Sequence, residues 1–142
     1  MLDTCINKII KELGVGVRYS SKVKKDAYYF ASVNLIVVNS KIPEIAQKLA
    51  LLHELGHACK HQDNYALYNT TYALHSKMEK DAEEFMIEKM IEVRTEDPDF
   101  NPATFNSVNF LESYDLDLKY EPVVKEFMTH YFAGGTMDTI FF

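Results

Sequence analysis

The sequence predicts a single α+β domain over residues 1–142, in which a small antiparallel sheet of about three strands packs on a helical core. Three observations support this fold class. A chain of 142 residues with 47% hydrophobic residues is long enough to bury one core. Short runs of β-branched and aromatic residues before Ser40 are typical of strands. Apolar residues recur at helical spacing through most of the remaining chain.

The first elements lead from a helix through the sheet to a second helix. Apolar residues at helical spacing predict a helix over Asp3–Leu13, which Gly14 ends. The three expected strands are Val15–Tyr19, Ala27–Ser32 and Leu35–Asn39. Pro43 suits the first turn of the next helix, so the third strand leads directly into it.

That next helix, expected over Ile45–Cys59, carries the H-E-x-x-H motif His53-Glu54-Leu55-Gly56-His57. At this spacing the two histidines differ by about 40° around the helix axis and about 6 Å along it, so both rings can reach one ion. Glu54 projects from the neighbouring face, where it can act on a metal-bound water without being a ligand. The motif predicts one zinc ion per chain. Spacing alone leaves iron and manganese open, although a three-ligand site with an open position favours zinc.

Two histidines at helical spacing can also be ordinary core residues. Apolar side chains nearly surround this helix, however, and a buried His-Glu-His group needs partners that offset its desolvation. His57 and His61 share the same spacing, but no acid lies between them, so His61 is expected behind a ligand or at the surface. Cys59 points away from the metal and is expected to pack in the core.

A second informative helix is expected over Lys77–Arg94, after a loop or weak hairpin over Gln62–Ser76 that includes His75. Its apolar stripe comprises Met78, Ala82, Phe85, Met86, Met90 and Val93. The charges expected on the solvated side are Lys77, Asp81, Glu84, Glu88 and Glu92. Glu79 instead lies within about 50° of the stripe centre, and an acid directed at the core needs a partner. Glu79 is therefore the candidate third zinc ligand, with Glu83 in reserve.

Beyond Arg94, a helix is expected from Asn101-Pro102 to about Leu111, and another over Pro122–Phe132. The final apolar residues, Thr136–Phe142, are expected to pack back or to meet a partner.

Two motifs together resemble the ImmA/IrrE family of zinc metallopeptidases. They are His53-Glu54-Leu55-Gly56-His57 and Glu79-Lys80-Asp81-Ala82-Glu83-Glu84-Phe85, of which the second is similar to the family pattern E-x-E-A-N-x-F-A. The resemblance implies a zincin-like domain of the gluzincin type, with zinc on His53, His57 and Glu79 and with Glu54 as catalytic base. Glu83 departs from the pattern, because it stands where the family more often has Asn or Asp.

Composition narrows the classes of partner. A net charge of −6 argues against binding to the negatively charged backbone of nucleic acid. The short basic run Lys22–Lys25 is expected at a solvated turn or strand edge. Two cysteines make no disulfide framework, and no apolar run is long enough to span a bilayer. Because the first residues also lack the pattern of a signal peptide, a cytoplasmic protein without membrane contact is expected. The oligomeric state is left open.

The expected function is zinc-dependent hydrolysis of a peptide bond. By resemblance, the substrate would be a helix-turn-helix transcriptional repressor of a phage, mobile element or stress response. An extended substrate is expected to add to the sheet edge near Val33–Val38. Tyr114, His130 and Tyr131 are candidates for stabilising the oxyanion, although aromatic residues of this kind more often serve packing. The alternative is a zinc-stabilised binding protein, an antirepressor that sequesters its partner without cutting it.

Overall fold

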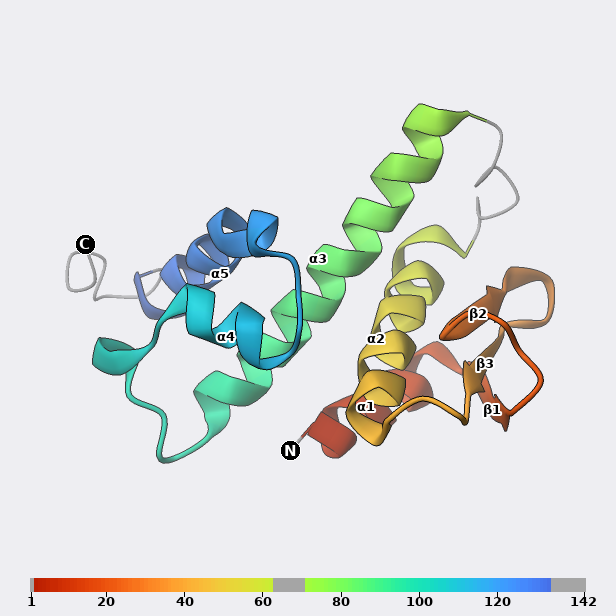
Figure 1. The fold of residues 1–142 in the computed structure, drawn as a ribbon, viewed down its shortest axis with the longest axis horizontal. Helices are drawn as coiled ribbons and strands as arrows, with labels where there is room; N and C mark the ends of the chain where they lie inside the picture. Colours follow the sequence, from red (N-terminus) through yellow and green to blue (C-terminus); the bar gives the residue numbers. More distant parts are fainter. Residues whose placement is uncertain (1, 63–70, 134–142) are drawn as a thin grey trace. The chain divides into compact units, whose positions relative to one another are not determined.

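The computed structural model of the chain describes residues 2–62 and 71–133 (Figure 1). The chain forms two compact units, Met1–Lys89 and Met90–Phe142, and the boundary between them falls inside one long helix. The α+β class is confirmed, whereas the single-domain organisation expected from chain length stays a prediction.

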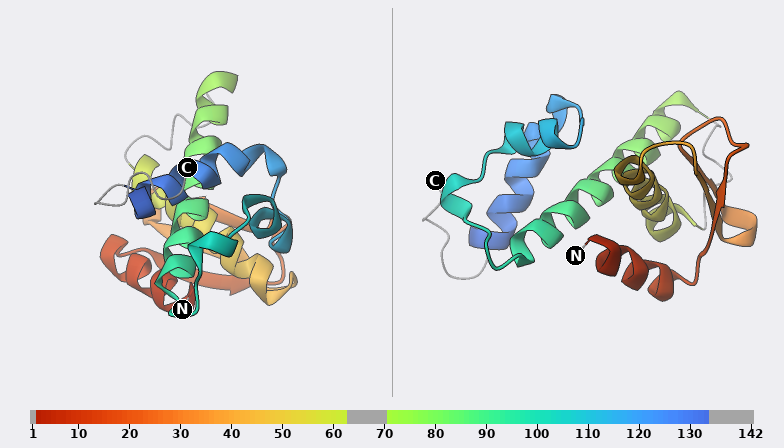
Figure 2. Two further views of the ribbon diagram at one scale, coloured as in Figure 1. Left: turned by 90° about the vertical axis from the view of Figure 1, so that its left-hand side faces the viewer. Right: turned by 60° about the horizontal axis from the view of Figure 1, so that its bottom comes forward.

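The first unit combines a three-stranded sheet with two helices and the first part of a third. Helix α1 spans Leu2–Leu13, and the strands β1, β2 and β3 span Gly16–Ser20, Ala27–Phe30 and Leu35–Asn39. A short 3-10 turn, η1, occupies Ala31–Val33. Helix α2 spans Glu44–His61, and α3 spans Tyr72–Glu96. Figures 1 and 2 show α2 lying between the sheet and the first part of α3.

The sheet is mixed rather than purely antiparallel, and its strand order is β1-β3-β2. Strand β2 pairs antiparallel with β3, whereas β1 pairs parallel with β3. Runs of β-branched and aromatic residues predicted the strands but not their spatial order. Because β1 and β2 run in opposite directions and β3 lies between them, β3 must be parallel to one and antiparallel to the other.

This order also corrects the expected place of the substrate. The segment Val33–Val38 contains most of β3, which is the central strand and is paired on both sides. Its main-chain groups are therefore already used within the sheet. The strands at the two edges are β1 and β2.

Asn34 joins the sheet to the end of α1. Its backbone is left-handed, with φ 49° and ψ 54°, a conformation that asparagine tolerates better than most residues. Its side-chain amide donates to the carbonyl oxygens of Leu13 and Gly14, and its side-chain oxygen accepts from the Tyr29 hydroxyl. One side chain thus connects β2, the turn before β3 and the C-terminal end of α1.

Unit 2 begins at Met90 and contains the last turns of α3, then α4 over Ser107–Ser113 and α5 over Glu121–Ala133. The 3-10 turns η3 and η4 span Pro102–Thr104 and Leu118–Tyr120. The single helix expected from Asn101 to Leu111 is therefore wrong. It divides because the side chains of Asn101 and Asn106 each accept a backbone N–H, so that each begins a separate helical segment. Buried residues at the centre of this unit include Ile91, Phe110, Leu111 and Val124.

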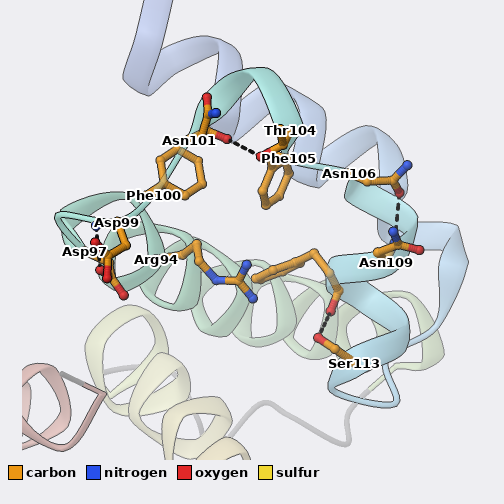
Figure 3. Close-up of a pocket in the computed structure, with 11 residues that line it drawn as sticks. Arg94, Asp97, Asp99, Phe100, Asn101, Thr104, Phe105, Asn106, Asn109 and Ser113 are labelled. Atoms are coloured by element: carbon orange, nitrogen blue, oxygen red, sulfur yellow. Dashed lines mark hydrogen bonds between the residues drawn. The ribbon is translucent and has the colours of Figure 1, made fainter.

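The second unit contains a hollow of about 540 Å³, and Figure 3 shows the residues that line it. The guanidinium of Arg94 lies 5.5 Å from the centre of the Phe110 ring on one side of it. Asn101 and Asn106, which cap the two segments, also line it. These amides already accept backbone hydrogen bonds, so the hollow follows from how the two helical segments begin.

Other expectations about the chain have mixed outcomes. His75 lies within α3, not in a loop, because Thr71 accepts a hydrogen bond from the Leu74 N–H and starts the helix earlier than expected. Most of the remaining loop, residues 63–70, and the tail Thr136–Phe142 lie outside the described residues. Within the described ranges, none of the helices combines the length and the apolar content that crossing a bilayer requires.

Candidate metal centre

Both histidines of the H-E-x-x-H motif lie on α2, on the side that faces α3. Their ring centres are 5.1 Å apart, as the four-residue helical spacing predicts. His57 is 1% exposed, whereas His53 is partly open to solvent with 14% of its side chain exposed. The site therefore has a buried side and an accessible side.

Glu79 reaches this pair from α3. Its Oε2 atom lies 2.5 Å from Nε2 of His57 and 3.3 Å from Nε2 of His53. Two imidazole nitrogens thus converge on a single carboxylate oxygen. The expectation that Glu79 is directed from the stripe side of α3 toward the motif agrees with this placement, and Glu79 remains partly exposed.

Gly56 explains how α2 and α3 come close enough for this contact. A methyl group placed on Gly56 would lie 3.0 Å from the Cα atom and 3.1 Å from the carbonyl oxygen of Ala82. Any larger residue would push the two backbones apart. The glycine inside the motif is therefore part of the site's architecture.

Glu54 lies next to the two histidines. His53, Glu54 and His57 can each bring one ligand atom within 4.8 Å of the others, an arrangement that could hold a metal ion. Burial raises the pKa of the Glu54 carboxyl to about 7. The positive charges of His53 and Lys25 act in the opposite direction but do not outweigh burial. A carboxylate with a pKa near neutrality is suited to taking up and giving back a proton.

The second ring nitrogen of each histidine, Nδ1, faces away from Glu79 and also has a partner. Nδ1 of His53 lies 2.9 Å from Oε1 of Glu83. Nδ1 of His57 lies 3.0 Å from Nδ1 of His61, which is 4% exposed. His61 is therefore behind a candidate ligand, one of the two places considered for it. Glu83 touches His53 on the side opposite to Glu79, which favours a supporting position over that of a ligand.

Asp81 completes this second set of contacts. Its Oδ2 atom lies 3.2 Å from Nε2 of His61 and 3.0 Å from Nζ of Lys77. The expectation that Asp81 is simply a solvated charge is wrong, because the end of α2 brings His61 beside it. Hydrogen bonds from Lys77 and His61 outweigh the effect of burial and lower the pKa of Asp81.

Cys59 does not pack in the core as expected, because it is exposed. Two residues past His57, it lies on the opposite side of α2. The apolar sequence of α2 predicted burial around nearly the whole helix. The structure buries the segment from Leu49 to Ala58 most completely, and leaves Ile45 46% exposed.

The charges of the site suit a cation. Burial opposes ionisation of Glu79, but hydrogen bonds from His53 and His57 outweigh it and hold its pKa well below the usual range. Burial likewise lowers the pKa of His57. A neutral His57 ring offers a lone pair. Burial also lowers the pKa of His53, but hydrogen bonds to Glu79 and Glu83 outweigh it and raise that pKa to about 10, so this ring must lose a proton before it can bind a metal. With that proton lost, two imidazole nitrogens beside an ionised carboxylate form a donor set typical of zinc. The residues present therefore fit a metal ion.

Three residues of this centre had only weak signals in the sequence. Glu83 was a reserve ligand and His61 shared the helical spacing, but nothing in the sequence linked Asp81 to His61. Tyr114, His130 and Tyr131 lie in the second unit, and their role at the oxyanion stays a prediction.

Comparison with known proteins agrees with the two motifs. The sequence profile of a peptidase family, M78, described as the IrrE N-terminal-like domain, matches residues 10–131. The match covers most of the chain and contains both motifs, which confirms the resemblance to the ImmA/IrrE family. No curated protein and no solved structure matches the chain significantly.

Proposed function

The chain belongs to the IrrE N-terminal-like family of peptidases, and from this premise we propose that it is a zinc-dependent endopeptidase. The observation that carries the proposal is the meeting of His53 Nε2 and His57 Nε2 at one oxygen of Glu79, with Glu54 beside them. In this proposal one zinc ion binds to His53, His57 and Glu79, and Glu54 is the general base. Glu54 could itself complete a ligand set, but Glu79 already contacts both nitrogens.

A bound zinc ion would polarise the scissile carbonyl and make a water easier to deprotonate. Glu54 takes the proton from the attacking water and later returns it to the leaving amine. Its partly buried carboxyl, with a pKa raised to about 7, suits both transfers near neutral pH. Glu83 orients the His53 ring by accepting a hydrogen bond from Nδ1.

We place the substrate along the outer edge of β2, in place of the β3 segment that the sequence suggested. Helix α2 packs on β2, and Lys25, two residues before this strand, acts electrostatically on Glu54. Asn39 donates its N–H to the carbonyl of Asp26, so antiparallel alternation directs the main-chain groups of Ala27 and Tyr29 away from β3. An extended peptide could pair with them and lie across the motif helix.

The proposed partner is a helix-turn-helix transcriptional repressor, of phage or mobile-element type, and the proposed location is the cytoplasm. The repressor rests on the family resemblance alone. An exposed thiol at Cys59 is compatible with the reducing conditions of the cytoplasm.

The test uses the full chain, loaded with zinc, and a peptide library derived from a digested proteome. Mass spectrometry would identify new cleavage sites and, in parallel, the zinc content of the protein. We expect one zinc per chain in the parent and in Glu54→Gln, with cleavage reduced about 10²–10⁴-fold in the variant, because only the base is removed.

Retained cleavage by Glu54→Gln would contradict the assigned base. A zinc-loaded parent that cuts no peptide, yet holds an intact repressor in a stable complex, would replace the peptidase with the antirepressor alternative. Loss of zinc in Glu54→Gln would instead make Glu54 a ligand.

A further inference from the structure

A line of hydrogen-bonding groups runs from the metal centre to the surface of α3. It starts at His57, passes through the 3.0 Å contact between the Nδ1 atoms of His57 and His61, and continues through the 3.2 Å contact from His61 Nε2 to Asp81 Oδ2. Lys77 Nζ lies 3.0 Å from the same oxygen of Asp81. His57 and Asp81 belong to the two motifs, whereas His61 and Lys77 lie outside them, and the line leaves the site on the side of His57 away from Glu79.

The protons along this line can be assigned by valence. If His57 Nε2 is a metal ligand, the proton of the neutral ring lies on Nδ1, which must then donate. His61 Nδ1 must accept, so the proton of His61 lies on Nε2. That N–H donates to Asp81, whose carboxylate also receives the Lys77 ammonium. Each group along the line thus has one consistent role.

Because both histidine rings are buried, each N–H and each lone pair along the line needs a partner within the protein. His57 and His61 are 1% and 4% exposed, so bulk water has little access to replace either partner. A buried N–H on His57 without an acceptor would cost free energy. In the alternative tautomer of His57, Nδ1 would accept a hydrogen bond from His61 Nδ1. The proton of His57 would then lie on Nε2, the nitrogen that should bind the metal.

We propose that His61 and Asp81 are positioning residues that hold His57 in the tautomer presenting Nε2 to the metal. This inference rests on the proposed metal site. His61 sets the tautomer directly, and Asp81 sets that of His61. Glu83 performs the corresponding task for His53 with a single carboxylate.

The test compares zinc affinity and ring protonation in the full-length parent, His61→Phe and His61→Gln. Phe fills the space but cannot accept a hydrogen bond, whereas the Gln carbonyl can accept one from His57. We expect His61→Phe to bind zinc about 10–100-fold more weakly in chelator competition, and His61→Gln to recover most of the loss. Lys60→Gln, an exposed change next to His61, is the matched control and should bind zinc like the parent.

Long-range proton–nitrogen NMR of the histidine rings then reports the tautomers in the zinc-loaded parent, without any substitution at the site. The expected result is a proton on Nδ1 of His57 and on Nε2 of His61. Asp81→Ala should lower the fraction of His61 that carries its proton on Nε2. Thermal unfolding of the metal-free variants separates a folding defect from a loss of zinc affinity.

The outcomes distinguish this inference from the proposed function. If the parent binds zinc but His61 carries its proton on Nδ1, or if folded His61→Phe binds zinc as tightly as the parent, the positioning role is wrong and the metal site stands. If the parent binds no zinc, the proposed function fails and this inference fails with it.

Discussion

Gly56 on α2 and Ala82 on α3 are in such close contact that a Cβ atom on Gly56 would lie 3.0 Å from the Cα atom of Ala82. In the sequence of α2, Gly56 stands between His53 and His57. Glu79 and Glu83 stand three residues before and one residue after Ala82. The distance between the two helices at this point therefore determines whether those acids reach His53 and His57.

Gly56→Ala should destabilise the protein by about 1–3 kcal/mol, because the added methyl group meets backbone atoms that cannot rotate away. Moving α3 outward should also weaken zinc binding. Chemical denaturation of the metal-free protein and chelator competition would measure the two effects. Ser76→Ala, an exposed change on α3, is the control and should alter neither. Unchanged stability and affinity in Gly56→Ala would show that the helices are not held together this closely.

Glu79 and Glu83 should respond differently to removal. Glu79→Ala removes a proposed ligand and should abolish stoichiometric zinc binding at micromolar zinc. Glu83→Ala removes only the acceptor of the His53 hydrogen bond, so one zinc should still bind, about 10–100-fold more weakly. Glu83→Gln should recover much of that loss, because its amide oxygen can accept the same bond. Mass spectrometry would measure the metal content of each variant, and titration with zinc would then measure its affinity. If Glu83→Ala abolished zinc binding and Glu79→Ala only weakened it, Glu83 would be the ligand and Glu79 the supporting residue.

The stabilisation by zinc should increase with pH. In the metal-free protein, burial lowers the pKa of His53, but hydrogen bonds to Glu79 and Glu83 outweigh it and raise the pKa from 6.5 to about 10. The stability from this interaction is fully present below pH 6.5 and is lost as the pH rises toward 10. The pKa of Glu79 is lowered from 4.5, so its contribution is present above pH 4.5 and is lost as the pH falls.

Zinc must displace the His53 proton, and this displacement becomes easier as the pH rises. The rise in Tm on adding zinc should therefore be larger at about pH 8 than at about pH 6. Thermal unfolding with zinc and with a chelator at both pH values would measure it. A rise in Tm that shrinks at the higher pH would contradict the protonated His53 of the metal-free state.

The outer edge of β2 provides a test of substrate placement. Ala27→Pro removes an N–H that points away from β3, and an edge strand can accept proline at such a position. We expect zinc affinity to stay the same and KM for a cleaved peptide to rise. Ala27→Ser keeps the N–H and serves as the control. Unchanged KM in Ala27→Pro would place the peptide elsewhere.

Several parts of the site could be predicted from sequence because they depend on one helix at a time. His53 and His57 share a face of α2 through local backbone geometry, and Glu79 lies near the apolar stripe of α3 for the same reason. The pairing of His61 with Asp81 could not be predicted this way. Its two residues are on different helices. Each also had an ordinary alternative, because His61 could lie at the surface and Asp81 could be a solvated charge.

The sequence by itself determined the α+β class, the three strands, most of the helices and the family motifs at the centre. Residue composition, motif spacing and helical periodicity suffice for these, because each of them is a property of one element at a time. Only the tertiary structure decided that β3 lies between β1 and β2, that Glu79 meets both histidines at one oxygen, and that His61 and Asp81 stand behind His57. These relationships depend on how separate elements pack against one another. Between α2 and α3, the contact of Gly56 with Ala82 sets the distance between the helix axes, and a pattern within one helix carries no information about that distance.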